Sequence, residues 1–315
     1  DSTQGVCAAC YGLDLSTASD FTGTLHSSAT LNTSAALATL APNATYYARV
    51  RAVNNNNVPS AYTGLGSTIT LAAQPGTVTD IFTPVLVSSL AVNFSSGTPP
   101  NPAGTAYQVR LSSFSDFNVY AARNTVKLYA RFAGLSVNTT WFARVRAQNY
   151  SGSRTDFTEL SSTATLAVAP GVAVSTYSNL TANGFTLAWS SGSAAAGYNP
   201  VDTYYAAQIS TSSGFTGDII ENVAASTSTD LGGLVPGTTY YARVRALNRV
   251  NITSAFTLYG STTTAASAKP AFLAGTLEVS NSLGQFIDAA LYTDTTTPDI
   301  RVSVLSAFAP GLSTV

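Results

Sequence analysis

The stretch LVPGTTYYARVRALN, residues 234–248, decides the fold of this chain. It begins with a turn signal, because the pair Pro236-Gly237 favours a reverse turn. It then alternates between apolar and polar residues, which predicts a half-buried β-strand with Arg243 and Arg245 on its outer face. Turn and strand together indicate one part of a β-module.

The five residues ARVRA occur three times, at 48–52, 143–147 and 242–246. The copies are 95 and 99 residues apart. A period of that length is too long for a solenoid repeat and fits one small domain per copy. We therefore expect a tandem array of similar β-modules.

Proline-containing segments near Pro75, Pro170 and Pro270 mark the boundaries between these modules. A proline at the start of a module is acceptable, because an edge strand need not donate its N–H. The linkers are very short, which predicts a fairly stiff rod. The expected domains are a partial module at 1–73, complete modules at 74–168 and 169–267, and a β-rich tail or partial fourth module at 268–315.

The third copy resembles the fibronectin type III domain. Its strand 184–189 ends in a tryptophan, and the 234–248 stretch supplies the family's Leu-x-Pro-Gly-Thr-x-Tyr turn and alternating strand. The matching residues are Trp189, Leu234, Pro236, Gly237, Thr238, Tyr240, Val244, Ala246 and Asn248. The resemblance covers residues 1–267. It implies an all-β chain of immunoglobulin-like sandwiches of about 100 residues each, with Tyr240 as the tyrosine-corner residue.

The other two copies vary the aromatic signature. Phe94 stands where Trp189 does, and Trp141 stands where Tyr240 does, so the corner hydroxyl is lost in the second module. Tyr46 takes the corner position in the first module. The expected core signature is therefore Tyr46, Phe94, Trp141, Trp189 and Tyr240.

The first copy is incomplete. Tyr11 aligns with Tyr107, which lies 32 residues after Pro75, so about the first two strands of a module are missing before Tyr11. An immunoglobulin-like sandwich without these strands exposes core side chains and strand edges.

Three explanations for the incomplete module stay open. The chain is a segment of a longer array, an interpretation that the absence of Met and of a signal peptide also favours. Alternatively, the alternating tail strand with Ile300, Val302 and Val304 completes the first module of the next copy, which makes a head-to-tail filament. The third is a monomer with a strained first module.

Composition bounds the function. Charged residues make up 9% of the chain and the net charge is −1, whereas a nucleic-acid-binding protein carries a basic surface. A polybasic membrane patch is absent, and no apolar run is long enough to span a bilayer. A surface rich in Ser, Thr, Ala and Asn instead of charge favours an extracellular or cell-surface location.

Two cysteines and one histidine offer little chemistry. Cys7 and Cys10 form a C-x-x-C without a following helix, and a zinc site needs about four ligands. We expect a local disulfide, with pairing to another chain as the alternative. His26 is expected at the surface, and no cofactor, metal or catalytic residue is expected.

The paired arginines of the three ARVRA copies allow two interpretations. They could form a ladder that binds an anionic glycan or a neighbouring subunit. The other interpretation is a solvated sheet face with cross-strand partners, in which the arginine stems cover Tyr47, Phe142 and Tyr241.

Seven Asn-x-Ser/Thr sequons are candidate glycosylation sites, although a chain this rich in Asn, Ser and Thr produces about five by chance. They are Asn32, Asn43, Asn93, Asn138, Asn149, Asn179 and Asn251.

The sequence therefore predicts a non-enzymatic extracellular structural protein, a filament subunit whose partners are copies of itself. Other surface proteins or glycans are further possible partners, and no nucleic acid or membrane span is expected. The alternative is an adhesion or carbohydrate-associated spacer from a larger surface protein or secreted hydrolase.

Overall fold

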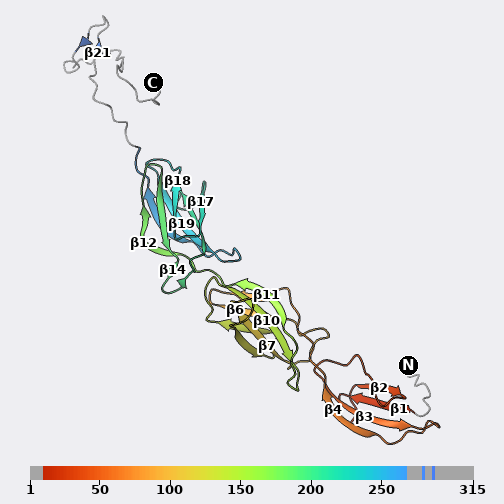
Figure 1. Cartoon of the computed structure of the whole chain (residues 1–315). Coiled ribbons are helices and arrows are strands. Elements are labelled where there is room, and N and C mark those ends of the chain that lie inside the picture. The colour runs from red at the N-terminus through yellow and green to blue at the C-terminus, as the bar shows by residue number, and fades with distance from the viewer. Residues whose placement is uncertain (1–9, 268–278, 281–285, 288–315) are drawn as a thin grey trace.

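The computed structural model describes residues 10–267, 279–280 and 286–287, and the regular structure there is entirely β (Figure 1). Three units follow one another in a line along the chain. The prediction of an all-β tandem of sandwich modules is thus confirmed. We name the units module 1 (residues 10–73), module 2 (74–168) and module 3 (169–267). No helix that could cross a membrane occurs in this part of the chain.

Module 2 is a complete sandwich of two antiparallel sheets. The first sheet has the order β5-β6-β9, and the second has the order β11-β10-β7-β8. The strands are β5 (Phe82–Val85), β6 (Ser89–Asn93), β7 (Ala106–Ser112), β8 (Ala121–Thr125), β9 (Tyr129–Ala133), β10 (Thr140–Gln148) and β11 (Thr158–Ala164).

Module 3 repeats this topology. Its sheets have the orders β12-β13-β18 and β17-β16-β19-β20, with a small added ribbon β14-β15. The strands are β12 (Gly171–Ser178), β13 (Gly184–Ser190), β14 (Gly192–Ser193), β15 (Gly197–Tyr198), β16 (Tyr204–Ser210), β17 (Ile220–Ala224), β18 (Ser228–Gly232), β19 (Thr239–Leu247) and β20 (Thr257–Thr263).

Module 1 contains only the second of these sheets among its described residues, in the order β2-β1-β3-β4. Its strands are β1 (Cys10–Ser16), β2 (Leu25–Thr30), β3 (Thr45–Val53) and β4 (Thr63–Ile69). We expected two strands to be missing, but a third is also absent, because no strand forms between β2 and β3. In modules 2 and 3 that strand is β9 or β18, and its only sheet partner is β6 or β13. Without that partner its backbone groups have no ladder to join.

The cores of modules 2 and 3 lie between their two sheets. Phe94 and Trp189 are buried there, each tilted against a tyrosine of the facing sheet, Tyr107 and Tyr205. Trp141 is only partly buried at the edge of the module 2 core. These contacts explain why the alternating aromatic pattern specifies a sandwich, since each ring fills the space between the two sheets.

Two short strands, β21 (Val279–Ser280) and β22 (Phe286–Ile287), form an antiparallel pair. The predicted donor residues Ile300, Val302 and Val304 lie outside the described residues, as do Cys7 and the rest of the predicted tail.

Candidate functional site: the module junctions

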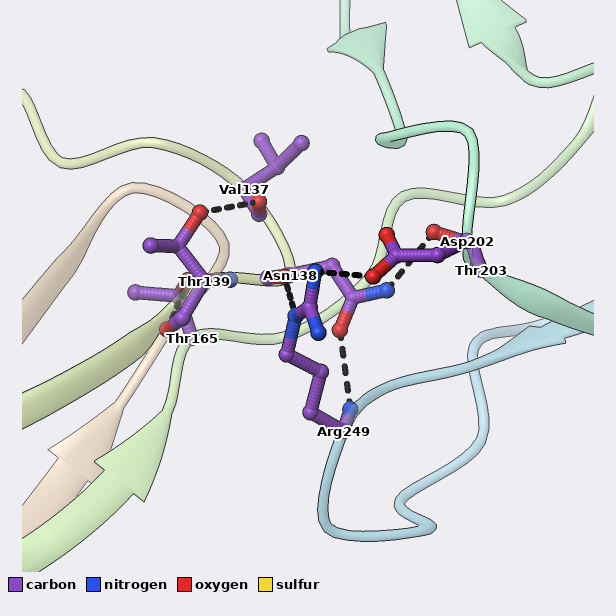
Figure 2. A network of polar contacts seen from close by, with 7 residues as sticks. All are labelled: Val137, Asn138, Thr139, Thr165, Asp202, Thr203 and Arg249. Atoms are coloured by element: carbon purple, nitrogen blue, oxygen red, sulfur yellow. Dashed lines mark hydrogen bonds and ion pairs between the residues drawn. The ribbon is translucent and has the colours of Figure 1, made fainter. Parts of the chain in front are cut away.

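A tight turn precedes the ARVRA strand in each module. We call the end of the module that carries this turn its upper end. In module 2 this turn is fixed by Thr165, whose hydroxyl donates to the Ser136 carbonyl at 2.7 Å. The same hydroxyl accepts from the Thr139 N–H at 3.0 Å (Figure 2). Thr70 and Thr264 make the equivalent bonds in modules 1 and 3. The turn places one residue in the left-handed region, where asparagine is among the better-tolerated residues.

At the second junction that residue is Asn138, with a φ of 42°. Its amide donates to the Thr203 hydroxyl of module 3 at 2.8 Å, and its side-chain oxygen accepts from the Arg249 backbone N–H at 2.8 Å. Figure 2 shows Asn138 between these two partners. The Arg249 guanidinium also reaches the Asn138 carbonyl at 3.0 Å and pairs with Asp202 at 2.6 Å. One side chain of module 2 therefore holds two separate segments of module 3.

The first junction repeats this arrangement. Asn43 has a φ of 46°, donates to the Thr105 hydroxyl at 2.8 Å and accepts from the Tyr150 N–H at 2.7 Å. We call this set of three groups the junction latch: the turn asparagine, the threonine and the backbone N–H. The two asparagines are 0% and 1% exposed, so both latches are sealed from water.

A second pair of asparagines ties each linker to the following module. Asn101 exchanges two hydrogen bonds with the backbone of Ala73, at 2.7 and 2.8 Å. Asn199 exchanges two with Val168, both at 2.9 Å. Buried polar groups that are fully paired fix one arrangement, because any other leaves them unsatisfied. The junctions are therefore specific docking surfaces and not loose tethers.

Burial of the latch asparagines bears on the predicted glycosylation sites. Asn43, Asn138 and Asn149 are buried, and each amide donates a hydrogen bond across a junction. A glycan on any of these three amides would replace that hydrogen bond and require the modules to separate, so the junction geometry disfavours glycosylation there. Asn93 is half-buried, whereas the remaining sites lie at exposed positions: Asn32, Asn179 and Asn251. Glycosylation at these four stays a prediction.

The first arginine of each ARVRA copy is clamped between two aromatic rings. Arg243 lies 4.1 Å from the ring centres of both Phe215 and Phe256. In module 2 the distances from Arg144 to Phe117 and Phe157 are 4.1 and 4.4 Å. In module 1 the rings belong to Phe21 and Tyr62, which lie 4.1 and 3.8 Å from Arg49.

These rings are not the expected neighbours Tyr47, Phe142 and Tyr241. They come from two loops on the outer side of the sheet, and sequence reasoning missed them. A signal was present, because one ring lies thirteen residues after the clamped arginine in every copy. Stacking on both faces fixes the guanidinium, and the Nε–H groups of Arg49 and Arg243 already donate to Asp14 and Gln208. The arrangement therefore favours a structural role for the first arginine.

Asp14 links two strands of module 1. It pairs with Arg49 at 3.1 Å and accepts a hydrogen bond from Ser27 at 2.7 Å. Burial opposes ionisation of the carboxyl, but the hydrogen bonds from Ser27, Tyr62 and Arg49 outweigh it and lower its pKa. Burial and the neighbouring carboxylate raise the pKa of Tyr62.

The inner face of the module 1 sheet is uncovered in the described structure. Tyr11 is 40% exposed, whereas its equivalent Tyr107 is 3% exposed in the module 2 core. Leu65 is 57% exposed, whereas its equivalent Leu160 is 1% exposed. We call this surface the open face; its residues are Tyr11, Leu13, Leu15, Ala48, Val50, Ala52 and Leu65.

The remaining candidate residues are Cys10 and His26. Cys10 is buried at the start of β1, and its predicted partner lies outside the described residues. His26 is half-buried, and its ring packs edge-on against Tyr46 with 5.8 Å between the ring centres. Among the described residues, no three potential metal ligands come together.

Residues 169–257 match the family model of the fibronectin type III domain. Module 3 is thus similar to a fibronectin type III domain, and module 2 shares its topology. A solved structure titled "two fibronectin type-III domain segment from chicken tenascin" is similar, with 18% sequence identity and a TM-score of 0.40. The match covers 61% of this chain and 99% of that one. No curated protein matches the sequence.

Proposed function

We propose that this chain is a non-enzymatic extracellular structural protein that holds what lies at its two ends at a fixed spacing. The observation that carries the proposal is the repetition of one buried hydrogen-bonding pattern at both junctions. Fibronectin type III domains are typically non-catalytic and commonly extracellular, and the low charge content agrees with such a location.

Small-angle scattering from the native chain tests the spacing role. We expect the distance distribution of three modules in a fixed line, unchanged between low and high salt because neutral side chains dominate the latches. A compact particle, or one whose dimensions vary with salt, would contradict the proposal.

We further propose that copies of the chain assemble head to tail into a surface filament, in which the tail strand with Ile300, Val302 and Val304 covers the open face of the next copy. Support comes from the apolar residues of the open face, whose equivalents are buried in modules 2 and 3. The pairing mode would be β-strand addition, in which main-chain hydrogen bonds give affinity and alternate side chains fill the sheet face.

Light scattering after size exclusion, without reducing agent, tests this assembly. The native chain should form particles of many subunits. Removal of residues 270–315 and the substitution Val50→Asp should each give a monomer, whereas Val172→Asp, a charge on the exposed strand β12, should leave the assembly intact. A native mass near 32.4 kDa would overturn the filament proposal.

The alternative function is an adhesion or carbohydrate-associated spacer within a larger surface protein or secreted hydrolase. The junctions favour it equally well, because a fixed spacing between modules needs no second copy. A monomeric native chain that keeps the extended scattering profile would select this alternative.

A further inference from the structure

We infer that the turn asparagine and its threonine form a docking code between modules, and that the upper end of module 3 carries the unlatched setting of this code. This inference goes beyond the proposed function. It concerns which module ends fit which partners, whether or not copies of the chain assemble.

Gly237 occupies the position of Asn43 and Asn138 at the upper end of module 3. The backbone there is the same: Gly237 has a φ of 63°, and its N–H donates to the Ala265 carbonyl at 3.1 Å. Asn43 and Asn138 make the matching backbone bonds at 3.0 and 3.2 Å. The turn is therefore intact in module 3, and only the side chain of the latch is missing.

Steric crowding does not account for the glycine. A Cβ placed on Gly237 would meet no atom within 4 Å. Asparagine adopts the same left-handed conformation at the two latched turns. The upper surface of module 3 thus has room for the latch asparagine but lacks it.

The threonine of the code also has a fixed position. Thr105 and Thr203 each lie two residues before the first core tyrosine of their module, Tyr107 and Tyr205. Each hydroxyl accepts the amide hydrogen bond of the preceding module's turn asparagine.

The code defines what each end fits. The upper ends of modules 1 and 2 fit a module that presents a threonine hydroxyl and a free backbone N–H after the ARVRA strand. The upper end of module 3 lacks the side chain that makes these bonds. Loss of the latch bonds permits a wider range of angles between neighbouring modules.

Pulsed electron–electron double resonance on the full chain measures this range of angles as the width of the distance distribution between two spin labels. Nitroxides attached through unnatural amino acids at the exposed positions Val126 and Val223 span the second junction and avoid the native cysteines. An excess of unlabelled chain removes distances between copies, so the result is independent of any filament.

Asn138→Gly gives the second junction the module 3 turn residue, and Thr203→Ala removes the hydroxyl that accepts the Asn138 amide bond. Each should broaden the distance distribution roughly twofold, because the sealed hydrogen bonds are lost. The double variant should be no broader than Asn138→Gly alone, because that substitution already removes the bond to Thr203. If the two substitutions instead disturbed the junction independently, their effects on the width of the distance distribution would add.

Two controls match the substitutions. Asn179→Gly changes an exposed asparagine at a φ of 52°, and Gly237→Asn changes a turn outside the labelled junction. Both should leave the width unchanged. Circular dichroism establishes that each variant is folded. A folded Asn138→Gly chain with the native width, or an additive double variant, would overturn the inference.

Discussion

The clamped arginine is the residue that most clearly repeats its environment in all three modules. A planar guanidinium between two rings gains attraction from both faces, a geometry that an ammonium group cannot reproduce. The positive φ of Phe21, Phe117 and Phe215 is costly for a bulky residue. The stacked arginine compensates for this conformational cost.

Arg243→Lys should destabilise module 3 by about 1–2 kcal/mol, because the lysine loses the double stack. Denaturant unfolding followed by Trp189 fluorescence, in a chain carrying Trp141→Phe, measures the change within module 3. The matched control is Arg154→Lys at an exposed position, which should stay within about 0.5 kcal/mol of native. Equal losses for the two variants would contradict the stacking role.

Asp14 gives module 1 a defined acid sensitivity. Its folded pKa lies below the ordinary value of 3.8. The stabilisation is therefore full above pH 3.8 and disappears as the pH falls through the lower folded value. Calorimetry should show Asp14→Asn lowering the module 1 transition at pH 7, with the difference from native shrinking below pH 3.8. A difference that grows towards acid would have the wrong sign.

At the scale of elements, the turn before the ARVRA strand is closed in two ways. The hydroxyl of Tyr46 accepts from the Ala41 N–H at 2.9 Å, and that of Tyr240 accepts from the Val235 N–H at 3.1 Å. In module 2 the indole N–H of Trp141 is buried without a hydrogen-bond partner. That turn therefore relies on Thr165 and on its contacts with module 3.

Trp141→Tyr should restore the missing corner bond. We expect it to be more stable than Trp141→Phe by about 1 kcal/mol, the net value of one hydrogen bond. Thermal unfolding of module 2 compares the two variants, which differ only in the hydroxyl. Identical stabilities would show that the corner hydrogen bond does not form in the module 2 turn.

A β-bulge interrupts the pairing of the ARVRA strand with the strand that follows it in every module. The bulged position is Gly66 in module 1 and Gly260 in module 3, both with positive φ. In module 2 it is Ser161, with a φ of 100°. Ser161→Gly should therefore stabilise module 2 by roughly 0.5–1 kcal/mol through relief of strain, measured by chemical denaturation. Ser162→Gly, one residue along the same strand, should destabilise it.

At the scale of the whole molecule, equivalent valines differ in what covers them. Val145 is fully buried between two sheets, whereas Val50 lies on the open face. Val145→Ala should cost roughly 2 kcal/mol, and Val50→Ala less than about 1 kcal/mol in dilute monomer. Calorimetry at two protein concentrations measures both. A Val50→Ala cost that rises with concentration would indicate that a second copy covers the open face.

Three features could be predicted from the sequence: the repeat, the strand pattern and the aromatic signature. They arise from the short-range alternation of apolar and polar residues, which recurs in each copy. The latch partners could not be predicted, since Asn43 and Thr105 are 62 residues apart and belong to different modules. The sequon at Asn138 suggested a surface site, although the module that follows buries it. The aromatic clamp was readable from its fixed spacing but involves two loops with no other pattern.

The sequence by itself determined that this protein is a tandem of β-sandwich modules, because side-chain periodicity fixes which face of each strand is buried. Only the tertiary structure decided which polar residues join the modules and which apolar face stays open. The physical reason is that burial of an asparagine, or exposure of a leucine, depends on what another segment places against it. Neither property belongs to the residue alone.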